Sequence, residues 1–269
     1  GVFAIVLPLL LHSVGFVSAY YIWTAFMIAG TILYFIMSCN AYHFQFRKQG
    51  YSEEASKAMA IEAGQELFPA GNMKQSLLLS ARIPETWILV IAYFVTFGGF
   101  MALTAWLPTY WQKAHGLSVT QAGLFTSVYA CLAALLRIPG GNLADKIGGL
   151  KVSLFAISLL GTVAAVMAFS SNLAVSGLCT LIIAVAFGLN NAAIMKLVPV
   201  YVSKSVGGAS GWVGGLGAFG GFVIPPVLGK VVDTMGATGY YRGFLIFSLF
   251  SVIVMLILYF GLVVRNKNK

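Results

Sequence analysis

The feature that most constrains this chain is a series of apolar runs, each close in length to the roughly 20 residues that an α-helix needs to cross a bilayer. Hydrophobic residues make up 59% of the 269 residues and charged residues only 9%. Soluble domains have about 25% charged residues, so these proportions exclude a soluble domain. The runs predict an all-α, polytopic bundle in a lipid bilayer, with eight spans at residues 1–15, 20–39, 86–107, 120–142, 152–170, 174–200, 208–230 and 243–264.

The distribution of positive charge predicts how these spans are oriented, because cytoplasmic loops carry an excess of Lys and Arg. The alternating spans place Arg47, Lys48, Lys57, Lys74, Arg82, Lys146, Lys151, Lys204, Arg265, Lys267 and Lys269 on one side, and Lys113, Lys230 and Arg242 on the other. We therefore expect a multi-pass protein of the cell membrane with its C-terminus in the cytoplasm. The same asymmetry accounts for the net charge of +9, so nucleic acid is not an expected partner.

A polar stretch at residues 41–85 interrupts the apolar pattern and holds five of the seven carboxylates. It predicts a cytoplasmic linker, with an amphipathic helix over 52–67 that lies along the membrane face. The linker separates two spans within residues 1–40 from six spans within 86–269. If six spans make one bundle, the first bundle lacks four, and we expect further N-terminal helices of the same protein before Gly1.

The chain shows no pattern typical of a metal site, a cofactor site or an enzyme. Its cysteines lie in apolar stretches, which predicts buried free thiols, and its histidines have no ligand spacing to one another or to a carboxylate. These residues are Cys39, Cys131, Cys179, His12, His43 and His115. A membrane-embedded enzyme needs acid–base or metal-binding residues that converge at depth. We therefore expect no metal, no cofactor and no enzymatic activity.

Two cations, Arg137 and Lys196, fall inside predicted spans, while no Asp or Glu lies deep in any span. A charge at the centre of a bilayer costs roughly 2.5–3.5 kcal/mol to insert, so such residues are functional-site candidates. A cation without an acidic partner predicts a bound anion. The alternative, which carries more weight for Lys196 near the inner end of its span, is a side chain that extends to the cytoplasmic interface.

Four further side chains are candidates for the same site. Asn190 and Asn191 precede Lys196 by one or two turns, and they either donate hydrogen bonds to a substrate or bond to a neighbouring helix. Tyr93 and Phe97 are spaced i, i+4 and therefore share a helix face, where they either line a cavity or belong to the core.

The segment 207–229 is rich in glycine. Its 207/211/215 and 217/221 spacings form ridges of small residues that allow two helices to approach to backbone contact. Together with the Pro225–Pro226 pair, they predict a hinge or sliding surface; tight static packing is the alternative. The glycines expected to take part are Gly211, Gly214, Gly215, Gly217, Gly220 and Gly221.

Residues 141–151 carry a recognisable motif, Gly141-Asn142-Leu143-Ala144-Asp145-Lys146-Ile147-Gly148-Gly149-Leu150-Lys151. It resembles the loop that joins the second and third helices in each six-helix half of the major facilitator superfamily. In this loop we expect Gly141 to allow close helix contact, Asp145 to cap a helix start, and Lys146 to hold the loop at the inner face. The resemblance implies that fold, here from its fifth to its twelfth helix.

Further residues resemble one branch of that superfamily, the nitrate/nitrite porters of the NarK type. The run 211–222, followed by Pro225, is similar to the glycine-rich signature of the eleventh helix. Arg137 matches the eighth-helix arginine that contacts the substrate in that family. Tyr93 and Phe97 match pocket positions of the seventh helix, and Lys196 matches the cytoplasmic end of the tenth, where members carry Lys or Gln.

The resemblance implies transport of nitrate, nitrite or both by alternating access in a monomer. Two arginines, one from each bundle, would hold a planar anion, with Tyr93 and Phe97 against its faces. Exchange of nitrate for nitrite is favoured over proton symport, because the predicted spans hold no carboxylate or histidine that could carry a proton, apart from His12 near an outer end. The alternatives are proton-coupled nitrate symport, a facilitator carrier for another small anion, and a non-transporting sensor on the same fold.

Overall fold

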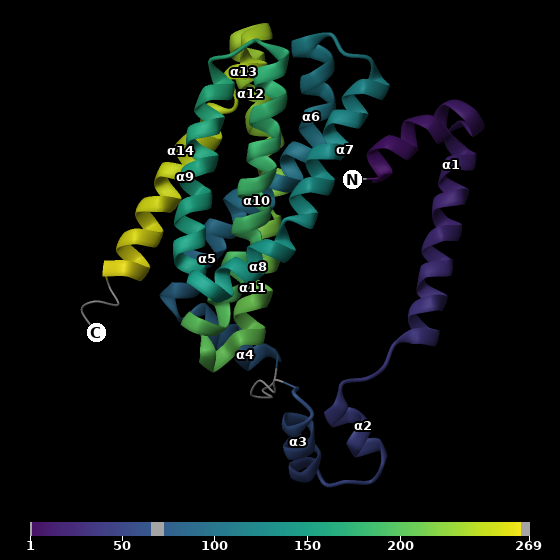
Figure 1. Ribbon diagram of the computed structural model, residues 1–269, viewed down its shortest axis with the longest axis vertical. Coiled ribbons are helices and arrows are strands. Elements are labelled where there is room, and N and C mark those ends of the chain that lie inside the picture. The colour runs from purple at the N-terminus through teal and green to yellow at the C-terminus, as the bar shows by residue number, and fades with distance from the viewer. Residues whose placement is uncertain (1, 66–72, 265–269) are drawn as a thin grey trace. The chain divides into compact units, whose positions relative to one another are not determined.

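The computed structural model describes residues 2–65 and 73–264, and every regular element in those ranges is a helix (Figure 1). The chain divides into two compact units, residues 9–70 and residues 71–269 together with 1–8, and each is described by itself. Seven described segments are long and apolar enough to cross a membrane, which confirms the predicted polytopic helical class. They are Ser13–Met37, Pro84–His115, Val119–Ile147, Gly149–Ala168, Leu173–Tyr201, Ser203–Arg242 and Leu245–Val264.

The spans predicted at 1–15 and 20–39 both fall largely within the first helix. Helix α1 runs from Val2 to Met37 and bends at Gly15, whose φ of 79° and ψ of 169° suit only glycine. Within α1, Ser13–Met37 is long and apolar enough to be a candidate span, and the span at 1–15 stays a prediction. Cys39, which follows the end of α1 at Met37, is exposed, so its predicted burial is wrong; Cys131 is half-buried and Cys179 is buried.

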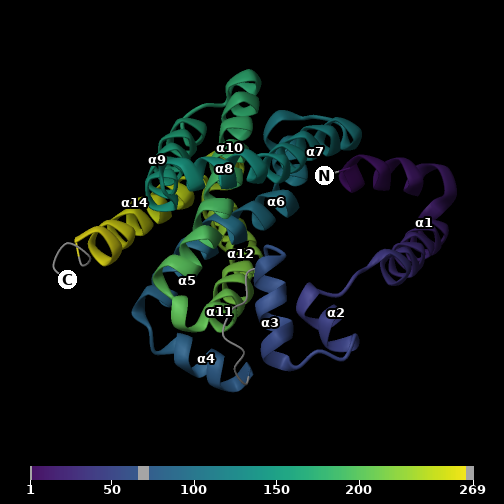
Figure 2. The same ribbon diagram turned by 60° about the horizontal axis from the view of Figure 1, so that its bottom comes forward.

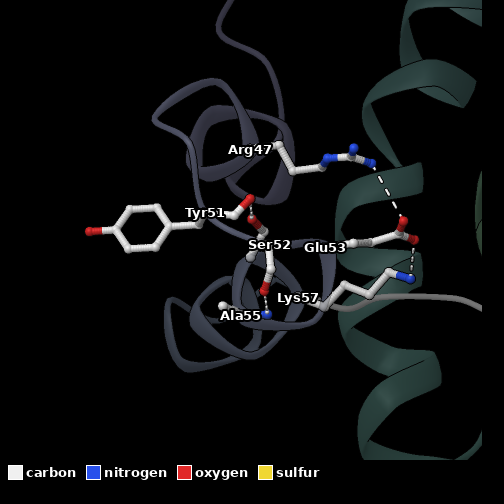
Figure 3. Close-up of polar contacts among 7 residues, drawn as sticks. Arg47, Tyr51, Ser52, Glu53, Ala55 and Lys57 are labelled. Atoms are coloured by element: carbon white, nitrogen blue, oxygen red, sulfur yellow. Dashed lines mark hydrogen bonds and ion pairs between the residues drawn. The ribbon is translucent and has the colours of Figure 1, made fainter.

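Two short helices, α2 (Tyr42–Lys48) and α3 (Glu53–Glu62), pack together after α1. Ser52 caps α3, since its Oγ accepts a hydrogen bond from the Ala55 amide at 3.2 Å (Figure 3). The Glu53 carboxylate pairs with Lys57 at 2.7 Å and with Arg47 at 3.5 Å. The helix predicted over 52–67 is therefore present but ends at Glu62, and residues 66 and 67 lie outside the described residues.

The larger unit holds the other six candidate spans, whose ends differ from the predicted ranges; most extend them, but Gly149–Ala168 ends before residue 170 and Leu245–Val264 begins after residue 243. The helices in order are α4 (Met73–Ala81), α5 (Pro84–Tyr93), η1 (Phe94–Gly98), α6 (Gly99–His115), α7 (Val119–Leu135), α8 (Arg137–Ile147), α9 (Gly149–Ala168), α10 (Leu173–Tyr201), η2 (Ser203–Ser205), α11 (Val206–Ala218), α12 (Gly220–Met235), η3 (Gly236–Thr238), α13 (Gly239–Arg242), α14 (Leu245–Leu258) and η4 (Tyr259–Val264).

Three of these spans are interrupted partway along their length. The first contains a π-helical turn, η1, between α5 and α6. The second breaks at Leu136, because Pro139 has no amide hydrogen to bond to the carbonyl of Leu135. The third breaks at Phe219, between glycines whose helix propensity is low. These interruptions give the functional site its shape.

Helix α10 is the centre of the larger unit and packs against α9, α8, α7 and α5 (Figures 1 and 2). Its residues Phe187, Ile194 and Val198 are fully buried. Such complete burial of an apolar helix requires partners on several sides.

Helix α4 lies against the start of α11, although residues up to 85 were predicted as linker (Figure 2). The Gly208 amide donates to Ser76 Oγ at 3.0 Å, and the Trp212 indole donates to the Leu77 carbonyl at 3.0 Å. A Cβ on Gly208 would clash with the Ser76 carbonyl oxygen, so only glycine allows this approach. The structure thus groups residues 73–85 with the spans that follow them.

Candidate functional site

The π-helical turn brings aromatic side chains into one row, which consists of Tyr93, Phe97, Phe100 and Tyr129. The rings of Tyr93 and Phe97 stack at 4.9 Å between centroids, and those of Phe97 and Phe100 at 6.3 Å. Tyr129 of α7 lies 5.9 Å from Phe100 and donates its hydroxyl to the Phe100 carbonyl at 3.2 Å. Tyr93 and Phe97 therefore share a face, as their spacing predicts. The remaining two members were not singled out from the sequence.

Arg137 lies over this aromatic row. Its guanidinium carbon is 4.9 Å from the Phe97 centroid and 5.7 Å from that of Phe100. Its Nε is buried and has no hydrogen-bond partner among the described residues. A guanidinium over aromatic rings gains roughly 0.5–2 kcal/mol, and it keeps its outer N–H groups available for an anion. The structure therefore places Arg137, Tyr93 and Phe97 together.

Two glycines position Arg137 by letting α8 approach α10. A Cβ on Gly188 would lie 2.7 Å from both the Ala133 carbonyl oxygen and Leu136 Cβ. A Cβ on Gly140 would lie 2.9 Å from Leu189 Cα. Any larger residue at either position would force the two helices apart. The sequence pattern gave no sign of this pair, because the two glycines lie on different helices.

The adjacent asparagines have different environments. Asn190 is fully buried; its Nδ2 donates to Thr96 Oγ1 at 2.9 Å, and its Oδ1 accepts from Ser153 Oγ at 2.5 Å. Its amide is thus used to join α10, η1 and α9, which is the interhelical alternative considered above. Asn191 is 2% exposed, and neither Nδ2 nor Oδ1 has a partner in the described part of the chain.

Lys196 forms an ion pair with Asp145. Its Nζ lies 2.8 Å from Asp145 Oδ2, and both side chains are about half exposed, at 50% and 56%. The expectation of an intramembrane cation without an acidic partner is therefore wrong for Lys196. Asp145 does not cap a helix start either, because α8 continues to Ile147 and α9 begins after Gly148 without a side-chain cap. The ion pair uses the carboxylate instead.

The remaining motif residues lie beside this ion pair. A Cβ on Gly141 would be 4.0 Å from Lys196 Cε, which is ordinary contact and leaves room for a side chain. Lys146 is exposed.

The glycines of α11 and α12 divide into two groups. The first group is in close contact with the span that contains η1. A Cβ on Gly217 would be 2.6 Å from a ring carbon of Tyr93, and a Cβ on Gly220 would clash with the Phe94 carbonyl. A Cβ on Gly221 would be 2.8 Å from Met101 Cβ. Gly98 of η1 completes this contact, since its own Cβ would be 2.6 Å from Gly220 Cα. The second group has more room: the nearest atom to such a Cβ is 3.6 Å away at Gly211 and 3.9 Å away at Gly214, and none lies within 4 Å at Gly215.

Comparison with known proteins identifies the family. The model of the Major Facilitator Superfamily matches residues 1–225 and 111–269. The "Nitrite extrusion protein" of Bacillus subtilis (strain 168) is 38% identical over 163 residues, which are 60% of this chain and 40% of that protein. The "Probable nitrate/nitrite antiporter NarK1" of Thermus thermophilus is 34% identical over 170 residues, 56% of this chain and 38% of that protein. The "Probable nitrate transporter NarT" of Staphylococcus haemolyticus (strain JCSC1435) is 33% identical over 174 residues, 64% and 44% respectively.

A solved structure supports the fold. It is that of a bacterial homolog to the human lysosomal transporter Spinster in an inward-facing and unoccupied conformation. Its TM-score is 0.50 at 16% identity, with 88% of this chain and 63% of that chain covered. The nitrate and nitrite relatives are matched over about two fifths of their length. These findings confirm the predicted resemblance and the prediction that the chain is not an enzyme. With the family model matched over more than half of its residues, the chain belongs to the Major Facilitator Superfamily.

Proposed function

We propose that this chain forms part of a membrane carrier that moves nitrate and nitrite by alternating access. The observation that carries the proposal is the position of Arg137, a cation in a membrane span that makes no ion pair within the described residues and lies against the aromatic row. An intramembrane arginine in this setting attracts an anion. The named functions of the nitrate and nitrite relatives support the choice of anion.

The geometry suits a small planar anion. A guanidinium is a planar fork whose N–H groups match two oxygens of a planar oxyanion, which an ammonium group does not do. The stacked rings of Tyr93 and Phe97 present flat apolar faces beside it. A second arginine from the other bundle, expected from the family resemblance, completes the site in this proposal. The same arrangement could bind another small anion. The competition experiment below distinguishes a nitrate and nitrite carrier from a carrier for such an anion.

The glycine contacts suggest how the site moves. Gly217, Gly220 and Gly98 hold the middle of the α11–α12 span in contact with the turn that carries Phe97, so these elements move as one body. The open group, Gly211, Gly214 and Gly215, provides the sliding surface. Rocking of the two bundles around the anion then exposes it to each side in turn.

The proposal also covers the orientation of the carrier in the membrane and whether it exchanges anions or couples transport to protons. The carrier works as a monomer, as the family resemblance implies. Its C-terminus lies in the cytoplasm, because of the basic asymmetry of its loops. It exchanges nitrate for nitrite, because the side chains that the described structure places against the Arg137 guanidinium are aromatic rings, not carboxylates or histidines. Proton-coupled symport is the alternative.

The proposal is tested by nitrate affinity in the intact transporter with Arg137→Lys and Arg137→Ala. Lys keeps the charge but loses the fork, so both variants are expected to weaken binding by at least about tenfold, in line with the loss of a charge-assisted hydrogen bond. Nitrite, formate and chloride serve as competitors, and nitrite alone is expected to compete strongly.

Arg242→Lys is the matched control, since Arg242 also lies over a phenylalanine, with its guanidinium carbon 4.3 Å from the Phe169 centroid. Its replacement is expected to leave nitrate affinity unchanged. Wild-type affinity in Arg137→Lys would remove Arg137 from the site, and stronger competition by formate or chloride than by nitrite would favour a carrier for another anion.

A further inference from the structure

Asn191 is a buried amide in a membrane span with no hydrogen-bond partner among the described residues. Leaving such a group unpaired in a buried position is unfavourable, so its presence calls for a partner. Its neighbour Asn190 has two partners, Thr96 and Ser153. Asn190 and Asn191 are adjacent on α10, so they differ in hydrogen bonding because their side chains face different neighbours.

Helix geometry fixes the direction in which Asn191 points. Successive residues of an α-helix are about 100° apart around its axis. Asn190 faces Thr96 of η1, and Gly188 faces Leu136, the residue before α8. Asn191 lies on the arc between these two directions, about 100° from Asn190 and about 60° from Gly188. It therefore faces the space between η1 and the start of α8.

That space is where Arg137 meets Phe97. Phe97 directly follows Thr96, Arg137 directly follows Leu136, and the guanidinium carbon lies 4.9 Å from the Phe97 centroid. Arg137 Nε is itself buried without a partner in the described structure. One side of the space thus carries an N–H that needs an acceptor, and the other carries an amide that can both accept and donate.

We infer that Asn191 is a further anion-binding residue of this carrier, an inference that rests on the proposed function. Its Nδ2–H donates to an oxygen of the anion that Arg137 holds. When the anion is bound, its Oδ1 also accepts from Nε–H of Arg137, a bond that the described structure does not contain, and so fixes the plane of the guanidinium. Asn191 adds a donor without adding charge, which increases selectivity for small oxyanions over halide ions that cannot use directed donors at two oxygens.

The experiment compares Asn191→Leu with Asn190→Leu in the intact transporter, measuring nitrate affinity and the thermal unfolding midpoint. Leu has the same number and branching of side-chain heavy atoms as Asn, although it is larger, and it has no polar atoms. Asn191→Leu is expected to weaken nitrate binding about 3- to 10-fold, the effect of one neutral hydrogen bond. It is expected to leave the unfolding midpoint unchanged or raised, because it removes a buried amide without partners.

Asn190→Leu is the matched control and is expected to lower the unfolding midpoint, since it breaks the bonds to Thr96 and Ser153. A double variant with Arg137→Lys completes the test. If Oδ1 orients Arg137, the effects of Asn191→Leu and Arg137→Lys on affinity are less than additive.

Two results would overturn the inference while leaving the proposed function intact. One is wild-type nitrate affinity in Asn191→Leu. The other is a fall in both affinity and unfolding midpoint, in parallel with Asn190→Leu, which would show a purely structural amide. If the wild-type transporter itself bound no nitrate, the proposed function would fail, and the inference with it.

Discussion

Gly217 lies directly beneath the ring of Tyr93: a Cβ on this glycine would be 2.6 Å from one ring carbon and 3.0 Å from the Tyr93 Cβ. The contact ties α11 to the end of α5, at the start of the aromatic row. Gly215, two residues earlier, has nothing within 4 Å of a Cβ in the described structure. The two glycines look alike in the sequence, yet only one is in close contact.

This relationship predicts opposite results for two matched substitutions. Gly217→Ala is expected to destabilise the protein by about 1–3 kcal/mol, because the methyl group must displace Tyr93. Gly215→Ala is expected to be neutral or to stabilise by up to about 1 kcal/mol, through its higher helix propensity. Thermal unfolding in detergent measures both. Equal losses of stability would mean that a part of the protein outside this chain packs on Gly215.

The ion pair between Lys196 and Asp145 predicts a small role for Lys196 in substrate binding. Lys196→Gln is expected to change nitrate affinity by less than about twofold, because its ammonium group pairs with Asp145 and the pair is half exposed. Lys196→Glu is expected to lower stability through repulsion, and the double reversal with Asp145→Lys is expected to recover it. A loss of affinity in Lys196→Gln comparable with that in Arg137→Ala would return Lys196 to the site.

The contacts of Glu53 predict a pH dependence for the start of α3. Its hydrogen bond from Lys57, then the charges of Lys57 and Arg47, lower the pKa of Glu53 below its ordinary value of 4.5. Because the pKa of Glu53 is lower in the folded state than in the unfolded state, the ionised carboxylate stabilises the folded state at pH values above the unfolded-state pKa. That contribution disappears as the pH falls through the folded-state pKa.

Hydrogen exchange at the amides of residues 53–57 measures this effect. Protection is expected to decrease as the pH falls below about 4.5, and Glu53→Gln is expected to abolish that decrease. Glu54→Gln is the control, because Glu54 lies in the same first turn but forms none of the ion pairs of Glu53. An identical response in both variants would exclude the Glu53 contacts as the cause.

The basic asymmetry of the loops predicts the orientation in the membrane. Single cysteines at Lys113 and Arg242 are expected to react with an impermeant thiol reagent from outside, and those at Lys57 and Lys146 only after the membrane is opened. Cys39 is exposed and must first be replaced by Ser. Labelling of Lys146→Cys in intact cells would invert the predicted topology.

The sequence by itself determined the class of this protein, because apolar runs of membrane-spanning length and the 141–151 motif are local features. It also placed Tyr93 and Phe97 on one face, since that follows from helix periodicity. It did not determine which of two adjacent asparagines or two nearby glycines would be in contact with other helices. Nor did it predict that Lys196 would pair with Asp145, 51 residues away along the chain. Those outcomes depend on how the helices are interrupted and on which faces they present to one another, and only tertiary packing decides that.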